Sequence, residues 1–154
     1  MLKTGDVAPA IELPDTDMKL CSLAEFAGSW IMVYFYPKDD TPGCTTEANE
    51  FTALIDEFAA AGAVVLGVSK DSCEKHRKFI AKHGLKVRLL ADTDGSICEL
   101  YGTWGPRKFM GREYMGIGRS TFVIDKHGKL VHVDYKVKAK GHAQAILEVV
   151  EGLD

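Results

Sequence analysis

A cysteine stands at the predicted start of a helix, between Pro37 and Glu47. Thr41 suits the N-cap, and Pro42 suits the first helical position because its missing N–H would be unpaired there anyway. Cys44 then falls at about the third helical residue. Unpaired backbone N–H groups and the positive end of the helix dipole both favour a thiolate over a thiol. The segment therefore predicts a nucleophilic cysteine.

The elements around this cysteine alternate between strand and helix. Residues 30–36 contain almost nothing polar, which is typical of a strand covered on both faces, and a helix is predicted over 42–61. A second apolar strand over 63–68 and a helix over 73–83 follow. This order predicts parallel strands joined by right-handed crossovers.

The rest of the chain adds shorter elements. We predict an opening hairpin (10–13 and 19–22), a short helix (22–27), a strand (87–91), a short helix (96–101), a long glycine-rich loop (102–118), a second hairpin (121–124 and 129–135) and a closing helix (142–150). Trp104 and Phe109 in the long loop either form an apolar collar for an organic substrate or pin the loop to the core.

The predicted topology brings three distant residues to one edge. Helices that follow parallel strands start at the carboxyl edge of the sheet, so Cys44 and Cys73 are expected to share it. Arg119 lies just before a strand that runs antiparallel to them and begins at the same edge. The fold class expected is α/β, arranged as a thioredoxin-like fold.

Bulk properties limit the function classes. The 154 residues suit one domain spanning 1–154, and a net charge of −3 with mixed signs suggests neither nucleic acid nor a membrane as partner. Without a signal peptide or spanning segment, a cytoplasmic location is expected. The four cysteines form no C-x-x-C motif, and the five histidines make no metal-ligand spacing with them and are interpreted as surface or turn residues. No metal and no cofactor are predicted.

Residues 35–47 carry a family resemblance. Pro37, Thr41 and Cys44 fit the P-x-x-x-T-x-x-C pattern of the peroxiredoxins, and the fuller segment resembles the bacterioferritin comigratory, or peroxiredoxin Q, branch. Further matches lie at 5–9, 104–111 and 118–125, so the resemblance covers nearly the whole chain. It implies a thioredoxin-like fold with an N-terminal β-hairpin extension, and a monomer or weak dimer.

The resemblance also implies a role for each site residue. Cys44 is the nucleophile toward hydrogen peroxide and alkyl hydroperoxides, and Arg119 orients thiolate and peroxide through its fixed donors. Thr41 accepts from a backbone N–H and positions the peroxide, or is a plain N-cap. Pro37 shields the thiolate by shape. Glu47 is either a partner of Arg119 or an ordinary helix carboxylate.

Regeneration of the thiol is where the sequence departs from the family. The two usual positions of the resolving cysteine hold Asn49 and Ile80. Cys73 lies nearer the catalytic edge on a similar helix face and is a substitute candidate. The alternatives are a one-cysteine cycle completed by thioredoxin or another external thiol, or resolution by Cys98 or Cys21, both of which otherwise read as buried structural thiols.

Two other function classes remain open at this point. One is a peroxide sensor or chaperone-like module on the same fold, in which oxidation of Cys44 changes shape without turnover. The other is a thiol-disulfide exchanger, which the missing C-x-x-C motif disfavours.

Overall fold

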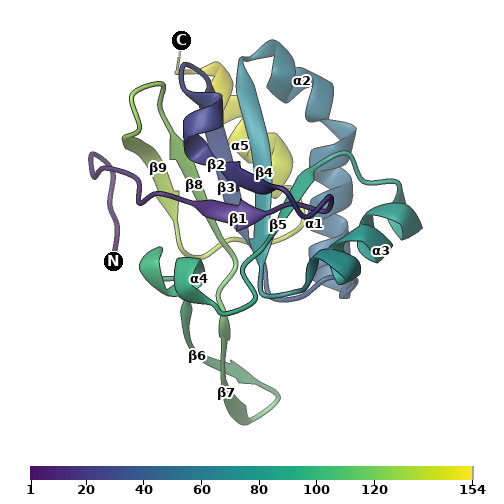
Figure 1. Cartoon of the computed structure of the whole chain (residues 1–154). Helices are drawn as coiled ribbons and strands as arrows, with labels where there is room; N and C mark the ends of the chain where they lie inside the picture. The colour runs from purple at the N-terminus through teal and green to yellow at the C-terminus, as the bar shows by residue number, and fades with distance from the viewer. Residues whose placement is uncertain (154) are drawn as a thin grey trace.

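The computed structural model describes residues 1–153, which fold around a five-stranded sheet of order β5-β4-β3-β8-β9 (Figure 1). Strands β3 (Trp30–Phe35), β4 (Ala63–Ser69) and β5 (Arg88–Ala91) are parallel. Strand β8 (Ser120–Ile124) is antiparallel to β3, and β9 (Leu130–Asp134) is antiparallel to β8. The structure therefore contains the parallel strands predicted from the alternation of strands and helices, and β8 and β9 add an antiparallel pair on one side of the sheet.

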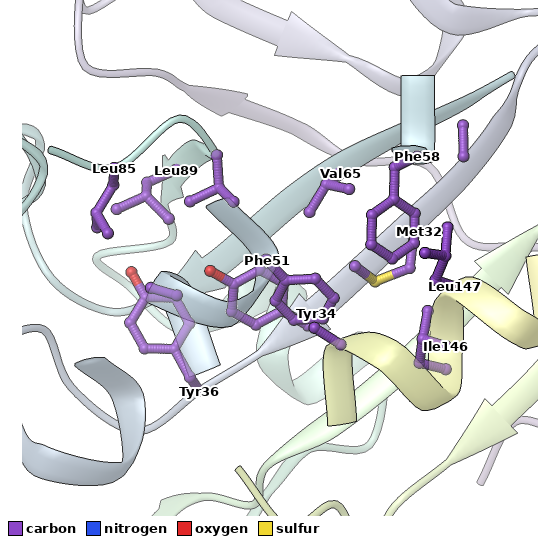
Figure 2. Close-up of a cluster of buried hydrophobic side chains, with 14 of the residues drawn as sticks. Met32, Tyr34, Tyr36, Phe51, Phe58, Val65, Leu85, Leu89, Ile146 and Leu147 are labelled. Carbon is purple, nitrogen blue, oxygen red and sulfur yellow. The ribbon is translucent and has the colours of Figure 1, made fainter. Parts of the chain in front are cut away.

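Helices cover one face of this sheet. They are α1 (Pro42–Ala53), α2 (Ile55–Ala60), α3 (Cys73–His83) and α5 (His142–Glu151). Their apolar residues pack with Tyr34 and Tyr36 of the β3 region, and Figure 2 shows Tyr34 beside Phe51 of α1. The Tyr34 ring stacks on Phe51 with centroids 4.7 Å apart. A Cβ on Gly67 of β4 would lie 2.8 Å from the Tyr34 ring, so a glycine there makes room for it.

The opposite face is covered by shorter elements. The N-terminal hairpin consists of β1 (Glu12–Pro14) and β2 (Leu20–Ser22), and it leads into the 3₁₀ helix η1 (Leu23–Phe26). Helix α4 (Ser96–Leu100) lies on the same side. The predicted opening hairpin and both short helices are thus found, with bounds that differ by a few residues. Among residues 1–153, no helix is long and apolar enough to cross a membrane.

Two predictions about elements are wrong. The single helix over 42–61 is divided at Leu54, whose backbone N–H bonds to Phe51 O and which separates α1 from α2. The long loop over 102–118 contains a hairpin, β6 (Trp104–Phe109) and β7 (Arg112–Ile117), which projects from the body in Figure 1. Met110 and Gly111 form its turn with φ angles of 50° and 80°.

The sheet positions the two helix starts and the strand start as the sequence predicts. Helix α1 follows β3 and helix α3 follows the adjacent parallel strand β4. Ser120 pairs with Phe35 at the beginning of β8, so Arg119 emerges beside the end of β3. Cys44, Cys73 and Arg119 therefore lie along the same edge.

Candidate active site

Cys44 is the third residue of α1 and is almost fully buried, at 2% exposure. Thr41 is in the extended N-cap conformation (φ −92°, ψ 156°), and its carbonyl accepts from Thr45 N at 2.8 Å. The N–H groups of this first turn belong to the set that an α-helix leaves unpaired. The local sequence thus holds a thiol beside backbone donors in a site where little water reaches it.

Arg119 bridges the thiol and a buried carboxyl group. Its Nη2 lies 3.5 Å from Cys44 Sγ, and its Nη1 donates to Glu47 Oε1 at 2.7 Å. Glu47 lies one turn after Cys44 and is fully buried. One planar guanidinium therefore contacts both residues from a fixed direction. Of the two readings of Glu47, the contacts favour the partner of Arg119.

The pKa shifts of this cluster have opposing causes. Burial raises the pKa of Glu47 to about 7, and the nearby Arg119 offsets this only in part. Burial acts to lower the pKa of Arg119, but Glu47 and Cys44 outweigh it and raise that pKa above its ordinary value. We take Arg119 as permanently charged and Glu47 as able to exchange a proton near neutral pH.

Two glycines make room for two different arginines, and the sequence analysis does not name either glycine as a site residue. A Cβ on Gly43 would come within 3.0 Å of Arg119 Nη2. A Cβ on Gly118 would collide with the guanidinium of Arg107, which reaches back from β6. A side chain at Gly43 would displace the Arg119 guanidinium, and one at Gly118, next in sequence to Arg119, would displace that of Arg107.

The side chain of Thr41 does not make the capping hydrogen bond that the sequence predicts. Its Oγ1 instead donates to Lys38 O at 2.8 Å, within the loop that precedes α1. The side chain therefore closes the loop and does not accept an N–H of α1. Pro37 is exposed in the same loop, and its shielding role stays a prediction.

The other cysteines lie in different surroundings. Cys73 is half-buried at the first position of α3, and both it and Cys44 are free thiols. Cys21 and Cys98 are buried in the cluster on the opposite face of the sheet, and burial raises the pKa of both. Both therefore favour the thiol form, which is the less reactive one.

The structure shows where the two aromatic residues of the predicted long loop lie. Trp104 is half-buried beneath Lys70 Nζ, 4.2 Å from the ring centroid, and so helps to pin the hairpin. Phe109 is 67% exposed at the far end of β6 and packs in neither core cluster.

The interpretation of all five histidines as surface or turn residues is wrong for His76 and His142, which are buried. Helical spacing places His76 three residues before Phe79 of the core, a signal that the sequence did offer.

Comparison with known proteins identifies the family. The profile of the AhpC/TSA family matches residues 4–133. A putative peroxiredoxin bcp of Helicobacter pylori (strain J99) is 47% identical over 147 residues, covering 96% of this chain and 97% of that protein. Peroxiredoxin Bcp of Bacillus subtilis is 44% identical over 152 residues, covering 99% and 97%. The chain belongs to the AhpC/TSA family.

Solved structures agree with this assignment. Peroxiredoxin Q of Xylella fastidiosa, crystallised as a cysteine-to-serine mutant, matches with a TM-score of 0.93 at 33% identity, covering 99% of this chain and 97% of that one. The bacterioferritin comigratory protein of Xanthomonas campestris matches with a TM-score of 0.88 at 38% identity, covering 96% and 98%. The predicted thioredoxin-like fold and the resemblance to the peroxiredoxin Q branch are therefore confirmed. The chain is a peroxiredoxin, an oxidoreductase of the peroxidase class.

Proposed function

We propose that this peroxiredoxin reduces hydrogen peroxide and alkyl hydroperoxides through Cys44. The observation that carries the proposal is the contact of Arg119 Nη2 with Cys44 Sγ at 3.5 Å, at the N-terminus of α1. The solved Xanthomonas campestris relative supports the substrate class, because that structure concerns its alkyl peroxide reduction activity.

In the proposed reaction the Cys44 thiolate attacks one peroxide oxygen. An S–O bond forms and the O–O bond breaks, and the leaving oxygen takes the electron pair and a proton from solvent to depart as water or alcohol. Arg119 and the N–H groups of the first turn stabilise the charge that develops on this oxygen. Cys44 is left as a sulfenic acid, which condenses with a thiol to release water and form a disulfide.

The thiol that completes the cycle is either Cys73 or an external one. Cys73 begins the helix that follows the neighbouring parallel strand, which supports an internal disulfide. Thioredoxin or another thiol then reduces the disulfide, or attacks the sulfenic acid directly in a one-cysteine cycle. We further propose that the chain works in the cytoplasm as one domain, as a monomer or weak dimer.

Peroxide consumption coupled to thioredoxin, its reductase and a nicotinamide donor tests the function. Cys44→Ser is expected to abolish turnover, because an alcohol far from its ionisation range is no nucleophile at neutral pH. Cys21→Ser and Cys98→Ser are the matched controls and should retain turnover. Thiol-dependent turnover that persists in Cys44→Ser would refute the assignment of Cys44 as the nucleophile. A wild type that is oxidised once per chain and does not turn over would favour the alternative of a peroxide sensor or chaperone-like module.

A further inference from the structure

A buried histidine on α3 has both ring nitrogens facing acceptors. His76 is fully buried; its Nε2 lies 3.0 Å from the carbonyl oxygen of Leu90 on β5, and its Nδ1 lies 2.6 Å from Asp39 Oδ2. A carbonyl oxygen only accepts, so Nε2 must carry a hydrogen. The bond between Nδ1 and Asp39 then needs a second proton, held either by His76 or by Asp39.

The surroundings of Asp39 place that second proton on His76. Asp39 Oδ1 accepts from the hydroxyl of Tyr36 at 2.6 Å, and a donor on one oxygen favours the ionised carboxylate, which accepts at Oδ2 as well. Burial raises the pKa of Tyr36, and the negative charge of Asp39 raises it further, so the Tyr36 hydroxyl keeps its proton and acts as a donor. The Asp39 backbone N–H donates to Asp71 Oδ2 at 2.8 Å, and polar atoms of Asp39, Asp71 and His76 lie within 4.8 Å of one another. A cationic ring beside two carboxylates is the charge arrangement that this cluster favours.

This cluster joins the site to the neighbouring helix. Asp39 lies in the β3–α1 loop, residues 36–41, which ends at the first turn of α1 with Cys44. His76 is on α3, three residues after Cys73, and Asp71 is in the segment between β4 and α3. A second link joins Asp40 of the same loop to Lys82 at 2.7 Å and His83 at 2.8 Å, but these groups are more exposed and their bonds contribute less.

We propose that His76, as an imidazolium, is a positioning residue that fixes the β3–α1 loop through Asp39 and thereby holds Cys44 against Arg119. Tyr36 and Asp71 complete the hydrogen bonds of the cluster, and Leu90 sets the ring orientation. For its kinetic consequence the inference rests on the proposed peroxidase function, but the protonation of His76 is measurable without any turnover.

The protonation is tested by ¹⁵N nuclear magnetic resonance of the reduced protein at pH 7. We expect both His76 nitrogens to show imidazolium shifts and both ring protons to exchange slowly. In Asp39→Asn the amide NH₂ donates to Nδ1 and the amide oxygen still accepts from Tyr36, so His76 should carry one proton only. A neutral His76 in the wild type would overturn the proposal.

Positioning is tested by the rate at which peroxide oxidises Cys44 in a single turnover. Asp39→Ala removes the link, and His76 can then lose its extra proton, so no unpaired charge stays buried. We expect this variant to react at least about tenfold more slowly, because a displacement of about 1 Å can cost about 100-fold in rate. Asp39→Asn keeps every hydrogen bond of the side chain and should stay within about threefold of the wild type by the same argument.

His83→Asn is the matched control, because it removes one of the two more exposed bonds, the one from His83 to Asp40, between the same helix and the same loop. It is expected to react at nearly the wild-type rate. His76→Phe, checked for folding by thermal unfolding, should behave like Asp39→Ala. Wild-type oxidation rates in folded Asp39→Ala would overturn the positioning role. Absence of turnover in the wild type would count against the proposed function alone, since the resonance experiment still decides the state of His76.

Discussion

Arg119 contacts the thiol and the buried carboxyl group with two different nitrogens of one rigid plane. Nη1 donates to Glu47 and Nη2 lies against Cys44, while Gly43 provides the space for the guanidinium. A lysine has the same charge but a single nitrogen, which cannot hold both contacts in this geometry. The direction of the donors, and not the charge alone, therefore defines the site.

Arg119→Lys is accordingly expected to slow the reaction of Cys44 with peroxide by at least about tenfold, which corresponds to about 1.4 kcal/mol of transition-state stabilisation. Stopped-flow oxidation of the reduced protein measures this rate. Arg77→Lys, an exposed change on α3, is the control and should leave the rate unchanged. Oxidation of Arg119→Lys at the wild-type rate would show that the guanidinium does not act on the reacting atoms.

Glu47 makes the stability of the protein depend on pH in a direction unusual for a carboxyl group. Its pKa is raised from 4.5 to about 7, chiefly by burial, so the folded protein holds the proton more tightly than the unfolded chain. The stabilisation from this group is fully present below about pH 4.5 and is lost as the pH rises through about 7. Glu47→Gln, which cannot ionise, has no such loss.

We therefore expect the unfolding free energy of Glu47→Gln to rise relative to that of the wild type between pH 5 and pH 8. Urea unfolding at several pH values measures the difference, and Glu74→Gln on the exposed side of α3 is the control. A difference that is independent of pH would show that Glu47 is ionised throughout this range.

At the scale of elements, the first turn of α1 must change shape if Cys73 resolves the cycle. A disulfide requires Cα atoms about 4.4 to 6.8 Å apart. We expect two separate helix starts that follow neighbouring strands to lie further apart than this while both stay wound. The first turn of α1, which contains Pro42 and Gly43, is the segment that can open, because terminal turns unfold at low cost.

Stoichiometric peroxide followed by alkylation and peptide mapping is expected to give a disulfide between Cys44 and Cys73, with faster amide exchange over residues 44–48. Cys73→Ser is the matched variant and should accumulate Cys44 as sulfenic or sulfinic acid. If the wild type itself gives oxidised Cys44 with Cys73 still open to alkylation, the one-cysteine cycle with an external thiol holds instead.

How far the sequence predicts an element depends on whether that element packs against the core. Strand β3 is buried along its whole length and helix α3 packs His76 and Phe79 inward, and the sequence predicts the bounds of both to within a residue. The β6–β7 hairpin exposes both faces, contains Pro106 and shows no alternation of apolar and polar residues, so its strands left no periodic signal. The break at Leu54 was missed because apolar residues continue at helical spacing on both sides of it.

The same reasoning applies to the site. Cys44 and Arg119 could be predicted because a helix-start pattern and strand topology place them at one edge. The hydrogen bond between Asp39 and His76 could not, because it joins residues 37 positions apart through side-chain directions that no local pattern encodes. The space that Gly43 and Gly118 leave for arginines is likewise visible only in three dimensions.

At the scale of the whole molecule, the closing helix α5 joins the sheet to the helix that carries Cys44. Its first residue, His142, is 8% exposed and bonds to Thr121 of β8 at 2.7 Å through Nε2. The ring also meets Phe51 of α1 edge-on, with centroids 6.1 Å apart. One buried imidazole therefore lies where α5, β8 and α1 meet, so its charge state affects the packing of all three.

The pKa of His142 is lowered to about 4, first by burial and further by His132 and Arg119, with Asp134 opposing. The folded protein thus binds this proton less tightly than the unfolded chain, whose value is 6.5. The stabilisation is fully present above about pH 6.5 and is lost as the pH falls through about 4. Acid should weaken the closure of α5 against the body of the protein.

We expect His142→Gln to gain unfolding free energy relative to the wild type as the pH falls from 7 to 4.5, because glutamine fixes a neutral side chain at this position. Urea unfolding at each pH gives both quantities, and the comparison uses the change with pH, so a constant destabilisation of the variant does not matter. His127→Gln, an exposed change in the β8–β9 turn, is the control and should keep the wild-type dependence. If His142→Gln is as acid-sensitive as the wild type, the proton that destabilises the fold binds elsewhere, and His142 does not link α5 to the acid stability of the molecule.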